Sequence, residues 1–548
     1  MQCRRLLAGG LLLFGAAAGF AASAHAAVDR AILKSQEGSS AILRGRYDLA
    51  IAAYDEALKD TSLSPARQAP IYTDRGVAKW RLKQLDEAVA DLTKAVSLNA
   101  DYAPAYNNRG TVFMDMNRFE DAYRDFDKAI ALSPGFGAAY ANRANANQKL
   151  RRLDAAEADF RKAIELMPAN AVPLNGRGRI ASVLGRQYTG LRYLNRAIAV
   201  NGQYTAAYQN RAAVYIALKR NEEAIQDLDK VIALVPDNAD LYVARGRLHK
   251  RERHDAPAFR DFQKALELSP NNVQALVGRA SLNFEWRRAD TALQDLNQAL
   301  SLDPGFAEIY FWRGQVRIAM NDIEGGEADL SKAIELKPDY SDAYRVRGSM
   351  RERAQRRDEA IADYRRAVEV DPFSREAGDT YRAASGDTPD SVIRPLAPAI
   401  DGWEIFSSGP GQYTALNGHY PKMPVLLEVR GDGTPEIVEW TPLKESLAGI
   451  GLLRYRVPGK TGAAYDYVAI LDLSRSTVVT IEPYIANGAK SKWAWTPNSV
   501  TVTDMDGLVS YYELSKPAQP RPGGNPYSFF GGGGRGSRGV PIIGWFFR

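Results

Sequence analysis

The chain has 548 residues, of which 45% are hydrophobic and 25% are charged, and this composition is typical of a folded, soluble protein with several domains. Its net charge of +6 suggests a nucleic-acid-binding protein, but residues 1–26 contribute +2 and residues 516–548 contribute +5. Residues 27–515 therefore have a net charge of −1, and we expect no nucleic-acid partner.

Residues 1–26 predict a secretory signal peptide. A short basic start precedes an apolar stretch, and Ala24-His25-Ala26 is typical of a cleavage site. We therefore expect cleavage after Ala26 and a periplasmic or secreted mature protein. No later stretch is apolar over 18 residues, so we expect no transmembrane span in the mature chain.

A period of 34 residues organises the chain from Ala69 onward, because in nine successive rows an arginine precedes a glycine or alanine. These arginines are Arg75, Arg109, Arg143, Arg177, Arg211, Arg245, Arg279, Arg313 and Arg347. Two further columns of mostly Ala or Gly follow, and a proline closes seven rows. Each row predicts two amphipathic helices that approach closely at the small residues, and the proline ends the second helix. One such hairpin cannot bury its own apolar face, so the rows must stack.

This pattern resembles the tetratricopeptide repeat over 69–374, and residues 46–58 add a tenth row behind a longer loop. The resemblance, which extends over about 31–385, implies an α-solenoid of about ten helical hairpins, wound into a superhelix. It also implies a concave groove that binds peptides or protein segments. We assign 27–385 to this array and expect a capping helix at its end, in SREAGDTYRAAS (374–385).

An aspartate column in the second helices follows the arginines at a spacing of sixteen residues. We expect structural ion pairs, formed either within one repeat or between stacked repeats. Among them are Arg109 with Asp125, Arg143 with Asp159, and Arg245 with Asp261. The most degenerate row, 171–204, tests the alternatives. It has Tyr193 at the aspartate position, so pairing between repeats would give Arg177 the carboxylate of Asp159.

The first helices supply the expected partner-binding groove. Their groove-facing positions are mostly neutral and polar early in the array and mixed later, which suits an extended segment held by amide hydrogen bonds. Plain solvation of an exposed helix face is the alternative. The candidate groove residues are Asn107, Thr111, Asn145, Gln148, Asn175, Arg179, Gln209, Arg247, Phe284 and Phe311.

No motif predicts catalysis, and we expect no enzymatic activity, cofactor or metal. The sequence has no GxSxG, HExxH or CxxC, and its one cysteine, Cys3, lies in the signal. VPGKTG (457–462) has Arg454 in place of the first glycine of a phosphate loop. TDMDGLVSYYEL (503–514) has Val502 at the first ligand position of a calcium loop, so we expect a hairpin there.

After a proline-containing linker at 386–401 the apolar period changes to two, so 402–515 predicts a small antiparallel all-β domain, either a sandwich or a barrel. Its aromatic residues are candidates either for stacking on sugars or for the core, and they include Trp403, Trp440, Tyr484, Trp493 and Trp495. Residues 516–548 form a Gly/Pro-rich tail whose apolar end, VPIIGWFFR, we expect to dock on this domain or on a partner.

The sequence therefore predicts an exported scaffold or adaptor that binds a protein or peptide in the groove of its repeats. The alternative is an envelope protein that binds carbohydrate or assists polysaccharide assembly through its β domain.

Overall fold

The structure is a computed structural model. It describes residues 30–60, 63–371 and 374–387 of the helical part. Of the C-terminal part it describes 395–396, 399–409, 412–417, 420, 423–429, 433–442, 449–458, 464–473, 475–484, 492–496, 499–503 and 509–514. The predicted signal peptide, the predicted tail and the turn at 504–508 lie outside the described residues.

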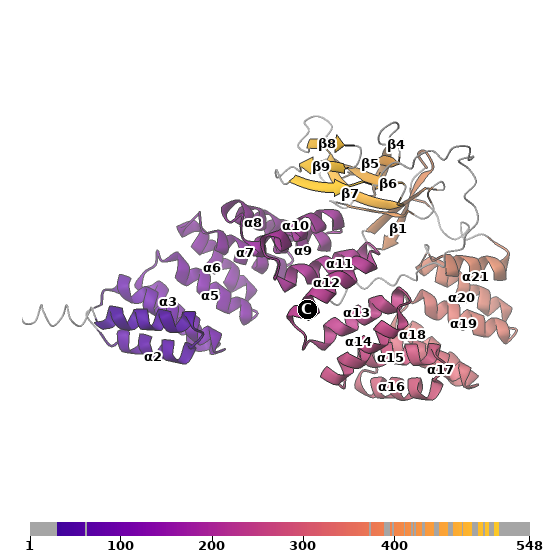
Figure 1. Cartoon of the computed structure of the whole chain (residues 1–548), viewed down its shortest axis with the longest axis horizontal. Helices are drawn as coiled ribbons and strands as arrows, with labels where there is room; N and C mark the ends of the chain where they lie inside the picture. The colour runs from indigo at the N-terminus through magenta and orange to yellow at the C-terminus, as the bar shows by residue number, and fades with distance from the viewer. Residues whose placement is uncertain are drawn as a thin grey trace, which may run out of the picture. The chain divides into compact units, whose positions relative to one another are not determined.

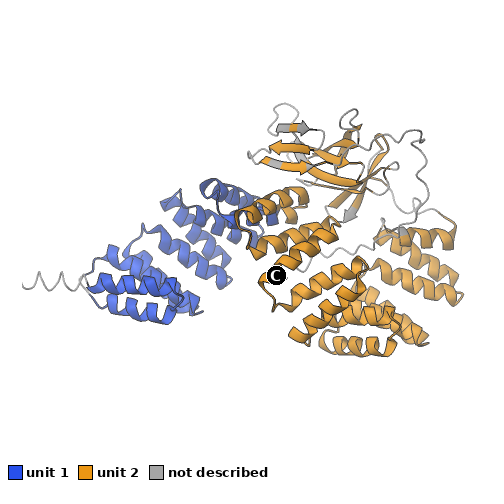
Figure 2. Ribbon diagram, viewed as in Figure 1, with its two compact units in different colours: residues 1–180 blue, residues 181–548 orange. Residues whose placement is uncertain are grey.

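The chain forms two compact units, residues 1–180 and 181–548 (Figure 2). The boundary between them falls inside 171–204, the row of the repeat that departs most from the pattern. Within the described residues, no helix is both long and apolar enough to cross a membrane.

The first unit is a stack of helical hairpins (Figure 1). After helical residues 30–43 it contains α2 (Tyr47–Ala57), α3 (Pro65–Arg81), α4 (Leu85–Leu98), α5 (Ala103–Asp115), α6 (Phe119–Leu132), α7 (Gly137–Lys149), α8 (Leu153–Leu166) and most of α9 (Ala171–Val183). Gly110 shows why small residues recur, because a Cβ there would lie 2.7 Å from Cε1 of the fully buried Phe126 on α6. The small residue lets the two helices of a hairpin approach closely.

A residue with positive φ makes the turn between the two helices of nearly every row. At the same position of successive rows these residues are Lys83, Asn117, Arg151, Gly185, Lys219, Arg253, Arg287, Asn321 and Gln355. The non-glycine residues have φ between 58° and 70°, in the left-handed region. One such residue ends the first helix and reverses the chain direction. Because it stands at the same position of each of these rows, the turn has the same length in all of them.

The second unit continues the hairpins and adds the β domain. Its helices are α10 (Gln187–Val200), α11 (Thr205–Ala217), α12 (Asn221–Leu234), α13 (Ala239–Arg251), α14 (Asp255–Leu268), α15 (Val273–Glu285), α16 (Ala289–Leu302), α17 (Ala307–Ala319), α18 (Ile323–Leu336), α19 (Ser341–Arg353), α20 (Arg357–Val370) and α21 (Arg375–Ser385). Ala377 and Tyr381 of α21 are buried against Tyr364 of α20, so α21 covers the apolar face of the last hairpin.

The strands of the β domain are all paired antiparallel, as predicted, in three sheets with the orders β1-β2-β3, β4-β5-β6-β7 and β8-β9-β10. They are β1 (Trp403–Gly409), β2 (Gln412–Asn417), β3 (Val425–Leu427), β4 (Glu436–Pro442), β5 (Ile450–Pro458), β6 (Ala464–Asp472), β7 (Thr477–Tyr484), β8 (Lys492–Thr496), β9 (Ser499–Thr503) and β10 (Val509–Glu513).

An apolar core lies on each face of the four-stranded sheet. Leu453 and Tyr455 of β5 point into one apolar core, which the sheet shares with β1, β2 and β3. Ile450 of the same strand points the other way and joins Val500 and Val502 of β9 in a second core. Trp403 is fully buried in the first core, so the prediction that it could stack on a sugar is wrong.

Candidate functional site

The recurring arginine of the repeat binds the aspartate sixteen residues later, within its own hairpin. In α5, Arg109 donates from Nε to Oδ2 of Asp125 over 2.7 Å and from Nη2 to Oδ1 over 2.8 Å. The same two bonds join Arg75–Asp91, Arg143–Asp159, Arg211–Asp227, Arg245–Asp261, Arg279–Asp295, Arg313–Asp329 and Arg347–Asp363. All eight aspartates are buried, and the bonds to Asp125 raise the pKa of Arg109.

In six of these eight pairs the third nitrogen of the guanidinium, Nη1, also bonds to a side chain of the preceding repeat. Nη1 of Arg143 lies 2.5 Å from Asp127, and Nη1 of Arg245 lies 2.7 Å from Asp229, sixteen residues earlier in each case. A tyrosine three residues before most of these arginines lies beneath the guanidinium, such as Tyr140 at 5.5 Å from Arg143. Arg143 of α7 therefore connects three helices, since it bonds to Asp159 of α8 and to Asp127 of α6. Arginine–aspartate pairing occurs within a repeat and also between neighbouring repeats.

The degenerate row breaks this scheme. Asp159 is bonded to Arg143 of its own repeat, so the alternative in which it serves Arg177 is wrong. Instead, Nε of Arg177 lies 3.8 Å from Oε1 of Glu157 on α8, and both side chains are buried.

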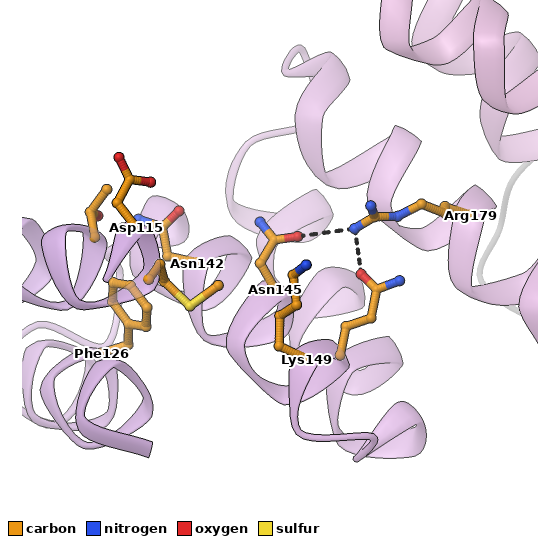
Figure 3. Close-up of a pocket in the computed structure, with 9 residues that line it drawn as sticks. Asp115, Phe126, Asn142, Asn145, Lys149 and Arg179 are labelled. Atoms are coloured by element: carbon orange, nitrogen blue, oxygen red, sulfur yellow. Dashed lines mark hydrogen bonds between the residues drawn. The ribbon is translucent and has the colours of Figure 1, made fainter. Parts of the chain in front are cut away.

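A pocket of about 310 Å³ lies on the first helices α5, α7 and α9 of the first unit, with Phe126 of α6 at its base (Figure 3). Its lining residues are Thr111, Met114, Asp115, Phe126, Asn142, Asn145, Gln148, Lys149 and Arg179. Four of them, Thr111, Asn145, Gln148 and Arg179, belong to the groove residues predicted from the sequence.

Amide side chains hold the cationic end of this pocket. Nη2 of Arg179 donates to Oδ1 of Asn145 over 3.4 Å and also to Oε1 of Gln148 (Figure 3). Because both amide oxygens accept from the guanidinium, the amide NH₂ groups are the donors that remain for a ligand. Lys149 adds a second, exposed cation.

The opposite end of the pocket is acidic. Asp115 accepts a hydrogen bond from Nε1 of Trp80 over 2.8 Å and lies 3.3 Å from Nζ of Lys83. Phe126 and Met114 supply the apolar lining between the two ends. The pocket thus has a carboxylate at one end, cations at the other, and amides and apolar groups between them.

Two of the predicted groove residues in the first unit are buried. Asn107 is 8% exposed, and its Oδ1 accepts a hydrogen bond from Nδ2 of Asn142 over 2.9 Å. Asn107 therefore orients the side chain of Asn142, which lines the pocket. Asn175 is also 8% exposed.

The remaining four candidates belong to the second unit. Gln209 is half-buried on α11, and Arg247 is paired with Glu308 over 2.9 Å. Phe284 contacts Trp312 edge to face, with ring centroids 6.4 Å apart. The prediction that Phe311 lines an exposed groove is wrong, because it is 6% exposed and its ring packs on that of Tyr340.

Beside these residues lies a mostly buried lysine. Lys250 of α13 lies 3.4 Å from Glu285, donates to Ser281, and has its Nζ 4.1 Å from the ring centroid of Trp312. Burial lowers the pKa of Lys250 from 10.5 to about 8. Among the described residues, no group of three or more His, Cys, Asp or Glu side chains is arranged to hold a metal ion.

Sequence reasoning missed Asp115, Asn142 and Lys149 in the pocket. The signal was present, because Asn142 lies three residues before Asn145 and Lys149 four residues after it, on the same helix face. Taking every residue of that face, rather than the positions next to the small column, would have included Asn142 and Lys149. Asp115 lies four residues after Thr111 on α5 and would have been found in the same way.

Family models of the tetratricopeptide repeat match residues 69–102, 103–136, 137–170 and 313–375, and a TPR repeat model matches 212–252. The chain is a tetratricopeptide repeat protein. All of these matches lie in the helical array, which contains the pocket and the arginine pairs. A tetratricopeptide repeat scaffold is consistent with protein–protein interaction.

The human and mouse proteins named DnaJ homolog subfamily C member 7 are each 36% identical to the chain over 69 residues, which is 13% of this chain. The chain spans 14% of the length of these relatives. Among solved structures, a tetratricopeptide repeat protein from Parabacteroides merdae is 21% identical with a TM-score of 0.37, covering 47% of this chain and 99% of that one. YrrB, described as a TPR protein with an unusual peptide-binding site, is 24% identical with a TM-score of 0.29, covering 34% and 95%.

Proposed function

We propose that this tetratricopeptide repeat protein is an exported scaffold that binds an extended segment of a protein partner in the pocket of its first unit. The observation that carries the proposal is the arrangement of amide side chains around Arg179, between cationic and acidic ends.

The chemistry of the pocket suits a peptide backbone. An extended backbone presents N–H donors and C=O acceptors that lose their water when it binds, and each must be given a partner. The NH₂ groups of Asn145 and Gln148 can donate to such carbonyls, and the exposed carboxylate of Asp115 can accept from an N–H or pair with a basic side chain. The cations at the other end favour an acidic residue of the partner, which would set the direction of the bound segment.

Export rests on the sequence of residues 1–26, with the cleavage site after Ala26. It places the scaffold and its partner in the periplasm or outside the cell. Stacking on a carbohydrate finds no support in the first two of the candidate aromatic residues, because Trp403 is buried and Trp440 packs on it at a centroid distance of 5.2 Å. The side chains of Trp493, Trp495 and Tyr484 lie outside the described residues.

Affinity capture from a periplasmic extract tests the proposal. The mature protein is compared with Arg179→Ala and with Asn145→Ala, and Lys162→Ala serves as a matched control on an exposed position of α8 outside the pocket. We expect a defined protein that both pocket variants retain about tenfold less than the wild type, while the control retains it fully. Equal capture by all four proteins contradicts the assignment of the pocket.

A further inference from the structure

Helix α10, the second helix of the degenerate row, lacks a feature that the other second helices of the described array share. Each of those has at least one Asp or Glu in its first turn, for example Asp121 in α6 and Glu222 in α12. An acid is favourable there because the first N–H groups of a helix have no partner inside it and the helix dipole is positive at that end. Helix α10 begins Gln187-Tyr188-Thr189 and has no acid in its first turn.

A carboxylate of the β domain takes this place. Oε1 of Glu428, the residue directly after β3, accepts from the backbone N–H of Tyr188 over 2.6 Å and from that of Thr189 over 3.0 Å. Its Oε2 accepts from the hydroxyl of Thr189 over 3.1 Å. Glu428 is 1% exposed, so the carboxylate has exchanged its water for these donors.

Both sides of the contact are held in place. The backbone N–H of Glu428 donates to the hydroxyl of Tyr455 over 3.0 Å, and that hydroxyl donates to the carbonyl of Glu428 over 2.9 Å. The ring of Tyr455 stacks on Tyr467 in the β core. On the helix, Nη2 of Arg192 donates to Oγ1 of Thr189 over 3.1 Å, which orients the hydroxyl toward Glu428.

An apolar contact surrounds this polar one. Tyr188, Leu191 and Leu194 of α10 are buried in the same cluster as Trp403 and Ile481 of the β domain. Strand β7 contacts α10 as well, and Figure 1 shows the strands beside α10 and α11. In a regular repeat the outer positions of the second helix's first turn are exposed, whereas all residues from 187 to 194 of α10 are buried.

We propose that the carboxylate of Glu428 holds the β domain on helix α10, and we call this contact the latch. We also propose that row 171–204 departs from the repeat pattern because it is the row that binds the β domain. Its acidic first turn is replaced by Tyr188 and Thr189, and Tyr193 stands at the position of the aspartate column. If the β domain separated from α10, the first N–H groups of the helix would lose the carboxylate that caps them, and the apolar cluster would be exposed at the same time. Binding of the β domain and order at the start of α10 are therefore coupled. The β domain is thereby a fixed part of the second unit and not a module that moves on the linker 386–401.

Hydrogen exchange of the full mature chain tests the latch. Glu428→Gln removes the charge at constant volume, and Thr189→Val removes the hydroxyl donor from the helix side. We expect the amides of Tyr188 and Thr189 to exchange about tenfold faster in Glu428→Gln than in the wild type. The matched control is Glu436→Gln, because Glu436 is exposed on β4 of the same domain, and it should leave these amides unchanged.

The double variant separates a shared contact from two independent effects. If Glu428 and Thr189 act together, Thr189→Val adds little to the exchange rate once Glu428→Gln is present. Unchanged exchange at Tyr188 and Thr189 in Glu428→Gln, with the β domain still folded by near-ultraviolet circular dichroism, overturns the proposal. If Glu428→Gln unfolds the β domain, Thr189→Val alone decides, and unchanged exchange in that variant overturns the proposal too.

Discussion

Arg109 and Asp125 lie sixteen residues apart in the sequence, yet two hydrogen bonds of 2.7 and 2.8 Å join the guanidinium to the carboxylate. The hairpin turn at Asn117, which has φ of 58°, lies eight residues from each and brings them to the same height. A planar, bidentate pair fixes the relative height and rotation of two helices, which apolar contacts alone do not fix. Its repetition explains why the arginine returns in the eight rows that also carry the aspartate.

Removing the carboxylate should destabilise the first unit. We expect Asp125→Asn to lower the free energy of unfolding by about 3 kcal/mol, at the low end for a buried pair because the side chain of Arg109 is 17% exposed. Denaturant unfolding followed by circular dichroism measures this loss. The control is Asp121→Asn, because Asp121 is 32% exposed and pairs with Arg118 on the surface, and it should cost less than about 1 kcal/mol. Equal losses would show that the column has no special role.

Lys250 should titrate near pH 8. Nitrogen-15 labelling of the lysines, with Lys250→Arg to assign its signal, measures the midpoint, and a midpoint above 10 contradicts the burial argument. The folded chain binds fewer protons than the unfolded chain between pH 8 and 10.5. The contribution of Lys250 to the free energy of unfolding therefore rises as the pH rises through this window and is constant below it.

Gly451 should not tolerate a side chain. A Cβ at this position of β5 would overlap the ring of Trp440, which is itself packed on Trp403 at 5.2 Å. We expect Gly451→Ala to cost about 1–3 kcal/mol in unfolding of the β domain, measured by tryptophan fluorescence in denaturant. Gly202→Ala, where the nearest atom lies 4.0 Å from the new Cβ, should change stability by no more than about 0.5 kcal/mol.

Export predicts a specific N-terminus. The protein recovered from a periplasmic or secreted fraction should begin at Ala27, and intact-mass spectrometry will show this directly. Retention of Met1 on the folded, fractionated protein would be incompatible with a cleaved signal.

The repeat and its ion pairs could be predicted because the same two helices pack against each other in successive rows, and the same residue types recur at the points of contact. An arginine and an aspartate recur sixteen residues apart, as Arg109 and Asp125 do, in so many rows that the sequence alone excludes chance. Phe311 could not be predicted as buried, because Tyr340, which packs on it, is the last residue of its row and lies beyond the second helix α18, where the helical spacing no longer relates the two positions.

The contact of Glu428 with Tyr188 joins residues 240 apart in the sequence, and no repeating pattern relates the two positions. Its traces in the sequence are the missing acid in the first turn of α10 and Tyr193 at the position of the aspartate column.

Photocrosslinking in cells tests the central claim, that a partner segment binds in the pocket of the first unit. A benzophenone amino acid is placed at Asn142, inside the pocket, and in a separate strain at Lys162 on α8, outside it. We expect a covalent adduct with one protein at position 142 and none at position 162, with the crosslinked peptide identified by mass spectrometry. Adducts of equal yield at both positions, or no adduct at position 142, would contradict binding in this pocket.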